Sequence, residues 1–253
     1  MQKIKYGWIK DKEDKRDFMY RAVAPTLTIP EKVDLSADFS EIENQEDLGS
    51  CTANALAGNL EFLDKVVDGK SIDVSRLFIY YNERKEEGTI NEDSGAMLRD
   101  GIKTLARYGS CSEKRIPYVV ANFKKKPSCI AYREATKHKI TSYHRIETLQ
   151  EMLNCLAEGF PFVFGFMVYS GMEAPEVAKT GVLNMPKPGE YECGGHAVCA
   201  VGYDQSQKRF LVRNSWGKEW GMQGYFTMPY EYMTQLADDF WTIRKVNPQT
   251  EED

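Results

Sequence analysis

The hydrophobic pattern changes its period near residue 136, and this change constrains the fold more than any other feature of the 253-residue chain. Before residue 136, apolar residues recur at helical spacing in three segments, residues 51–67, 75–84 and 97–108. After it, short β-rich runs bounded by glycine and proline follow one another: 139–146, 160–168, 195–203, 209–213, 224–228 and 240–246, with one helix at 149–159. The pattern predicts an α+β fold with a helical lobe, an antiparallel sheet or barrel, and a cleft between them.

Three segments follow from this pattern. Residues 1–30 form an N-terminal segment, residues 31–135 a mainly helical lobe, and residues 136–253 a β-barrel lobe. The N-terminal segment mixes charges with large apolar residues, among them Trp8, Phe18 and Tyr20, and continues through an extended Pro25–Pro30 connector, because proline disfavours helix in the residue before it. Two interpretations stay open: an inhibitory strap that lies over the cleft, or a structural brace.

Charge and hydropathy exclude several classes of function. The formal net charge of −5 offers no basic footprint for nucleic acid. No apolar run reaches the roughly 18 residues that a membrane span needs. The N-terminus lacks the apolar core of a signal peptide, so a cytoplasmic location is expected.

Cys51 follows a Gly-Ser turn and begins the first helical pattern. A helix start concentrates unpaired N–H groups and the positive end of the helix dipole, which favours thiolate over thiol. Such a cysteine is a candidate nucleophile. Gln45, six residues upstream, lies on the loop that leads into the same turn, where its amide can donate beside the sulfur.

Of the three histidines, His196 is the candidate base. His138 stands between lysines and is expected to be solvated, and His144 is expected on an exposed strand face. His196 begins a strongly apolar strand after Gly194 and Gly195, two glycines that leave room for a substrate to approach its ring.

A metal site at Cys193, His196 and Cys199 is disfavoured. Residues three apart in a strand point to opposite faces, and the two cysteines would lie roughly 20 Å apart. Zinc ligands must converge. The six cysteines form no disulfide framework, although spacing leaves a Cys111–Cys129 pair open.

Eighteen residues after His196, the sequence Asn-Ser-Trp-Gly places Asn214 at a strand end with Trp216 close by. A nucleophile–base pair generally needs a third group that orients the imidazole. Asn214 can accept the other ring N–H of His196, and Trp216 can shield that hydrogen bond from water.

Taken together, these motifs resemble the papain-like cysteine peptidases, and in particular a prokaryotic branch of that family. The order Gln45, Cys51, His196, Asn214 matches, as do Gly-Ser-Cys-x-Ala, the Gly-His-Ala-Val strand and Asn-Ser-Trp-Gly-x-x-Trp-Gly. The resemblance covers residues 33–246. It implies the two-lobe papain-like fold, and a Gly95 backbone that pairs with an extended substrate peptide.

The resemblance also implies an activity: hydrolysis of peptide bonds through a Cys51 thiolate and His196, with Gln45 in the oxyanion hole and an acyl-enzyme intermediate. No metal or organic cofactor is expected, and the partners are peptide or protein substrates. Leu48, Thr52 and Gly195 depart from the usual family pattern. Two alternatives remain: a non-catalytic peptide-binding scaffold, and acyl transfer to an acceptor other than water.

Overall fold

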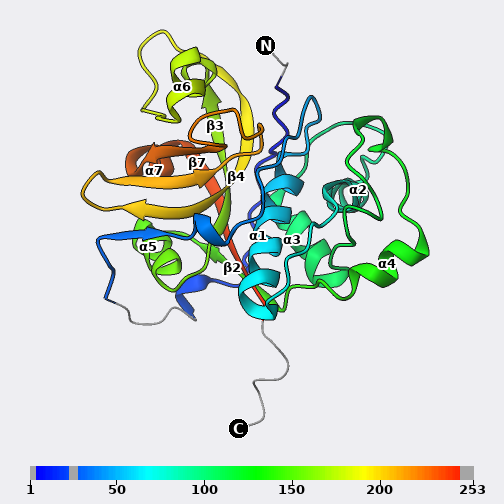
Figure 1. Cartoon of the computed structure of the whole chain (residues 1–253). Helices are drawn as coiled ribbons and strands as arrows, with labels where there is room; N and C mark the ends of the chain where they lie inside the picture. Colours follow the sequence, from blue (N-terminus) through cyan, green and yellow to red (C-terminus); the bar gives the residue numbers. More distant parts are fainter. Residues whose placement is uncertain (1–3, 23–27, 246–253) are drawn as a thin grey trace.

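The computed structural model describes residues 4–22 and 28–245. It has helices on one side and a sheet on the other, and Figure 1 shows the N-terminal segment running between them. The helical side contains α1 (Cys51–Asp68), α2 (Arg76–Glu87), α3 (Leu98–Arg107) and α4 (Cys129–Ala135), with short 3-10 turns at Ser36–Asp38 and Val120–Asn122. The predicted papain-like α+β fold is confirmed.

The sheet is antiparallel throughout. Its strands are β1 (Lys32–Asp34), β2 (Ser142–Ile146), β3 (Phe162–Tyr169), β4 (Glu192–Asp204), β5 (Arg209–Arg213), β6 (Tyr225–Pro229) and β7 (Ala237–Arg244). They follow the order β2-β7-β3-β4-β5-β6, and β1 pairs with β4. The path is open, since β2 and β6 lie at its two ends. Residues 32–34 thus join the sheet although they precede the helical segment.

Short helices cover the ends of the sheet. α5 (Leu149–Ala157) begins with a capping box, in which Thr148 accepts from the Glu151 backbone and the Glu151 side chain accepts in return. The turn Ser170–Glu173 and α6 (Pro175–Thr180) follow β3, and α7 (Tyr230–Leu236) follows β6. The sequence pattern predicted α5 but not α4, α6 or α7, whose six or seven residues are too short for a clear 3.6-residue period.

Two apolar cores hold α1 and the strands of the sheet in place around the cleft. One joins α1 to the sheet through Leu56, Leu60, Val163 and Trp241. The other lies on the opposite face of the sheet, around Phe162, Phe164 and Phe210. Because α1 packs directly on β4, its N-terminus meets the middle of that strand. Among the helices described, none has both the length and the apolar composition to cross a membrane.

Three side chains differ from expectation. His138 is not free in solvent, because its Nδ1 lies 2.9 Å from the buried Asp64 carboxylate. His144 is half-buried on β2, so its strand face is not exposed. Phe18 is 62% exposed and is no core anchor. Within the predicted 25–30 connector, residues 25–27 lie outside the described part of the chain.

Candidate active site

Cys51 is the first residue of α1 and is fully buried. The turn before it is held by Ser50, whose backbone N–H donates to the Leu48 carbonyl and whose hydroxyl lies 2.7 Å from the Tyr118 hydroxyl. The backbone N–H groups of Ala197 and Gly7 lie close enough to the Cys51 sulfur to act on its ionisation, and each favours a lower pKa of the thiol. The thiol therefore lies beside β4, next to the residue that follows His196.

His196 lies in β4, opposite Phe166 of β3, and is fully buried. Its Nε2 is 2.8 Å from the Asn214 side-chain oxygen. Nδ1 has no hydrogen-bond partner within the described residues. The Asn214 oxygen also accepts from the Ser215 backbone N–H at 2.9 Å, which fixes the orientation of the amide. An acceptor at Nε2 requires the proton there, leaving Nδ1 as the free basic nitrogen.

Trp216 covers this pair. Its ring stacks on the His196 imidazole with centroids 4.9 Å apart and an interplanar angle of 27°. Trp220 packs edge-on against Trp216 at 4.9 Å. A hydrogen bond shielded from water by these rings is electrostatically stronger than one that water can reach.

Gln45 is fully buried beside the same turn. Its side-chain oxygen accepts from the Ser215 hydroxyl at 2.7 Å, which orients the amide. The Nε2 group donates to the Leu48 carbonyl and to the carbonyl of Lys5, each at 3.0 Å. The amide therefore already holds a carbonyl oxygen, supplied by the N-terminal segment.

The N-terminal strap, defined here as residues 4–22, occupies the cleft. The Trp8 N–H donates to the Gly195 carbonyl at 2.9 Å. The Ala96 N–H donates to the Gly7 carbonyl at 2.8 Å, and the Ile9 N–H to the Ala96 carbonyl at 3.0 Å. Trp8 and Ala96 thus form a parallel bridge.

The predicted substrate-binding glycines all line this path. A β-carbon on Gly95 would lie 2.1 Å from the Gly7 carbonyl oxygen, and one on Gly194 would lie 2.9 Å from the Tyr6 side chain. On the helical side of the cleft the strap pairs with the backbone of Ala96, one position after the predicted Gly95, and on the sheet side with that of Gly195. The sequence does not mark Ala96 as a pairing residue, because the pairing uses only backbone atoms.

Tyr6, on the strap, covers the His196 and Trp216 side chains. Its ring lies 6.1 Å from the His196 ring and 6.3 Å from the Trp216 ring, both edge-on. Its hydroxyl donates to Glu173 at 2.5 Å. Burial and the Glu173 carboxylate raise the pKa of this phenol.

Burial by the strap opposes ionisation of the candidate nucleophile. It raises the pKa of Cys51 to about 11, although the N–H groups of Ala197, Gly7 and Thr52 act in the opposite direction. Burial also lowers the pKa of His196 to about 4, against the Asn214 hydrogen bond. Both shifts favour the neutral thiol and the neutral imidazole, so desolvation in the closed cleft opposes the helix-start effect expected from the sequence.

The positions that depart from the family pattern have structural partners. Thr52 donates from its hydroxyl to the buried Glu83 carboxyl at 3.0 Å. Leu48 is buried in the core between α1 and the sheet. All six cysteines are free thiols, so Cys111 and Cys129 do not pair in this structure.

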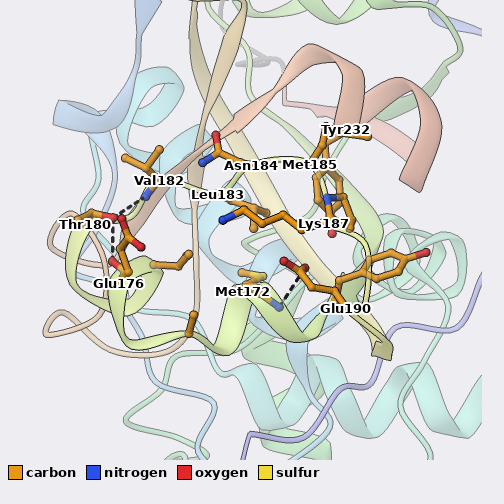
Figure 2. Close-up of a pocket in the computed structure, with 15 residues that line it drawn as sticks. Met172, Glu176, Thr180, Val182, Leu183, Asn184, Met185, Lys187, Glu190 and Tyr232 are labelled. Atoms are coloured by element: carbon orange, nitrogen blue, oxygen red, sulfur yellow. Dashed lines mark hydrogen bonds between the residues drawn. The ribbon is translucent and has the colours of Figure 1, made fainter.

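A separate cavity of about 180 Å³ lies under α6 and the loop that follows it. Figure 2 shows its lining, which includes Met172, Leu183, Glu190 and Tyr232. None of the predicted site residues contributes to this cavity. Elsewhere, carboxylate oxygens of Glu43, Glu61 and Asp73 come within 4.8 Å of one another, but Glu43 is paired with Arg76 at 2.7 Å.

The fold and this constellation define a cysteine peptidase. The papain family cysteine protease model matches residues 29–240, and the chain belongs to that family. It is 43% identical to an uncharacterized peptidase C1-like protein of Acanthamoeba polyphaga mimivirus, over 95% of this chain and 87% of the relative. It is 28% identical to chymopapain of Carica papaya, over 85% of this chain and 58% of that protein.

Among solved structures, the chain is similar to xylellain, a cysteine protease from Xylella fastidiosa. The TM-score is 0.90 at 44% identity, with 97% of this chain and 98% of xylellain covered. This agrees with the predicted likeness to a prokaryotic branch. ProCathepsin B from Trypanosoma congolense shares the fold with a TM-score of 0.74 at 19% identity, over 95% of this chain and 86% of that one.

Proposed function

We propose that this peptidase cleaves peptide bonds through Cys51 as nucleophile, His196 as acid and base, and Asn214 as the residue that orients the imidazole. The observation that carries the proposal is the 2.8 Å contact between His196 Nε2 and Asn214. This contact holds the proton on Nε2 and leaves Nδ1 free to accept a proton. His196 lies on β4, the strand that packs against α1, which begins with Cys51. This is the geometry that a nucleophile–base–orienter set requires.

Gln45 is the proposed oxyanion donor. Its amide is held by Ser215 and already donates to a carbonyl oxygen, that of Lys5, at 3.0 Å. A donor fixed before the reaction needs no reorganisation when negative charge develops on the substrate oxygen. The Cys51 backbone N–H, at the helix start, is the second proposed donor.

The reaction proceeds in two steps. The Cys51 proton passes to His196, the sulfur attacks the carbonyl carbon, and the carbonyl electron pair moves to the oxygen held by Gln45. The C–N bond then breaks, and His196 returns the proton to the leaving amine. In the second step His196 takes a proton from water, the hydroxide attacks the thioester, and the C–S bond breaks. The departing thiolate takes the proton from His196, which regenerates the Cys51 thiol and the neutral imidazole.

We further propose that the strap is an intramolecular blocker of the cleft. Its Lys5 carbonyl already accepts from the Gln45 amide at 3.0 Å, and its backbone pairs with Ala96 and Gly195 across the cleft. With the strap in place, Cys51 and His196 are fully buried, so a substrate cannot reach them. The proforms among proteins of the same fold, such as the proCathepsin B above, are compatible with such a role.

The far end of the strap also braces the fold. Tyr20 is 1% exposed within the core of the β lobe, and its hydroxyl donates to Glu158 at 2.9 Å. The two interpretations from the sequence therefore apply to different parts of one segment: residues 5–9 block, and Tyr20 anchors.

The test is hydrolysis of a pooled fluorogenic peptide library under reducing conditions. The chains compared are the full-length protein, Cys51→Ala, and Gly7→Val, whose added side chain displaces the strap. We expect low activity in the full-length protein, higher activity in Gly7→Val, and none in Cys51→Ala. Product masses that show addition of water identify hydrolysis. Peptide binding without cleavage in Gly7→Val would instead make the chain a non-catalytic scaffold.

A further inference from the structure

The Trp8 indole fills a narrow slot in the cleft whose walls are two glycines. A β-carbon on Gly165 would lie 1.9 Å from the indole Cε2, and one on Gly195 would lie 2.7 Å from its Cε3. Any larger residue at either position would close the slot. Its flat shape therefore comes from β3 and β4, the strands that also carry His196 and its neighbours.

Asp239 lies at the end of this slot. Opposite Gly165, strand β7 contains a bulge, since Val163 pairs with Trp241 while Gly165 pairs with Asp238. Asp239 lies in this bulge with a left-handed φ of 56°, an uncommon conformation that Asp tolerates better than most residues. Bulges redirect side chains, and this one places a fully buried carboxylate against the slot.

The two oxygens of Asp239 have different partners. Oδ1 accepts from Arg145 Nη2 at 3.0 Å, a contact within the folded body of the protein. Oδ2 accepts from Trp8 Nε1 at 3.1 Å and from the Asp11 backbone N–H at 2.7 Å, and both donors belong to the strap. When the strap leaves, Oδ2 loses both donors. Water then replaces them, and a side chain that seals the slot again must supply a donor of its own, because a buried acceptor without a partner is costly.

The carboxylates at the vacated slot keep a cation. The strap takes Lys10, Asp11 and Asp17 away with it, and Arg145 keeps its contacts of 3.1 and 3.0 Å to Asp238 and Asp239. A carboxylate already paired with a guanidinium has little need of a second cation. The free Oδ2 and the flat walls instead suit a neutral aromatic ring with a hydrogen-bond donor.

We propose that the Trp8 slot is a substrate side-chain subsite in which Asp239 selects tryptophan, and tyrosine less strongly, over phenylalanine. The inference rests on the proposed peptidase function and names the substrates of that site. A substrate indole would repeat the contacts of Trp8, packing between Gly165 and Gly195 and donating its N–H to Asp239. Phenylalanine fills the same space but leaves Oδ2 without a donor.

The first test is a position-scanned fluorogenic peptide library cleaved by the full-length Gly7→Val chain. At the position of strongest selection we expect kcat/KM for Trp to exceed that for Phe by about 10- to 100-fold. Asp239→Asn keeps the size and backbone preference of the residue but faces the indole with an amide, and it should bring the ratio close to one. Asp238→Asn is the matched control and should leave the ratio unchanged. Equal rates for Trp and Phe, a preference that survives Asp239→Asn, or arginine preferred over Trp would overturn the proposal.

A second test does not depend on catalysis or on strap release. Trp8→Ala in the full chain empties the slot, and indole should bind there at least ten times more tightly than indene, its isostere without an N–H, as measured by calorimetry. Asp239→Asn should remove this difference. If indole binds selectively but no peptide is cleaved by Gly7→Val, the proposed function fails while the subsite stands. If peptides are cleaved and indole and indene bind alike, the subsite fails alone.

Discussion

Gly7 lies so close to Gly49 that a β-carbon on Gly7 would come within 1.9 Å of the Gly49 carbonyl oxygen. On the other side, the Gly7 carbonyl oxygen leaves no room for a β-carbon on Gly95. The strap therefore crosses the cleft at its own glycine, between two glycines of the helical lobe. The position of the strap depends on the absence of a side chain at residue 7.

Gly7→Val should raise the peptidase activity of the full-length protein. The added side chain collides with backbone that cannot move aside, and such overpacking costs typically about 1–3 kcal/mol in the closed form. That cost shifts the opening equilibrium by about 5- to 150-fold, and kcat/KM for a fluorogenic peptide should rise by the same factor.

The control for this variant is Ile9→Ala. Ile9 is 40% exposed and holds the strap through its backbone N–H, which the substitution keeps. Its kcat/KM should stay within twofold of the wild-type value. A Gly7→Val protein that unfolds at a lower temperature but shows wild-type activity would mean that the strap does not limit access to Cys51.

Gln45→Glu in the Gly7→Val background should lower kcat by about 10²- to 10³-fold with little change in KM, because loss of one oxyanion donor has an effect of that size. Glutamate keeps an acceptor for the Ser215 hydroxyl, which lies 2.7 Å from the Gln45 oxygen. The variant therefore keeps the contact to Ser215 and removes the amide donor, both from the substrate oxygen and from the Leu48 carbonyl. Steady-state kinetics separate the two parameters, and a change confined to KM would exclude an oxyanion role.

Much of the candidate site can be predicted from the sequence because each of its parts has a local signature. A turn followed by a helical pattern places Cys51 at the start of α1, and a glycine pair before an apolar run places His196 on a strand. Asn214 comes directly after β5, the strand that pairs with β4, and this position brings its side chain to His196.

The path of the strap and the role of Asp239 could not be predicted, because both depend on contacts between distant parts of the chain. Trp8 and Asp239 are 231 residues apart, and the bulge that aims Asp239 arises from the register between β3 and β7. No periodicity in residues 237–244 marks that register. Trp8 stands out in the sequence as a large apolar residue in a charged segment, yet its context does not reveal that the ring fills the cleft.

Cys51 should react faster with iodoacetamide when the strap is displaced. In the closed form burial raises the pKa of Cys51 to about 11, which favours the thiol at pH 7. Exposure removes the desolvation and lowers the pKa, and a lower pKa means more thiolate at any pH below it. Because the buried sulfur reacts only after the strap opens, the alkylation rate of Gly7→Val at pH 7 should exceed that of the wild type by about 5- to 150-fold, the factor expected for the opening equilibrium.

Peptide-resolved mass spectrometry measures this rate for each cysteine separately. Cys129 is exposed and lies outside the cleft, at the start of α4, so it is an internal reference that should react at the same rate in both proteins. Equal rates at Cys51 across the pH range, with Cys129 unchanged, would show that the strap does not control ionisation of the nucleophile.

The two aromatic residues at the end of the strap should separate bracing from blocking. Tyr20 is 1% exposed in the β-lobe core, and Tyr20→Ala should lower the free energy of unfolding by about 3–5 kcal/mol, since it leaves a cavity and removes the donor to Glu158. Phe18, two residues earlier and 62% exposed, is the matched control, and Phe18→Ala should change stability by no more than about 0.5 kcal/mol. Urea denaturation of both variants, with Cys51→Ala added to prevent self-cleavage, gives these values directly. A Tyr20→Ala protein as stable as Phe18→Ala would mean that the strap contributes nothing to the fold beyond the cleft.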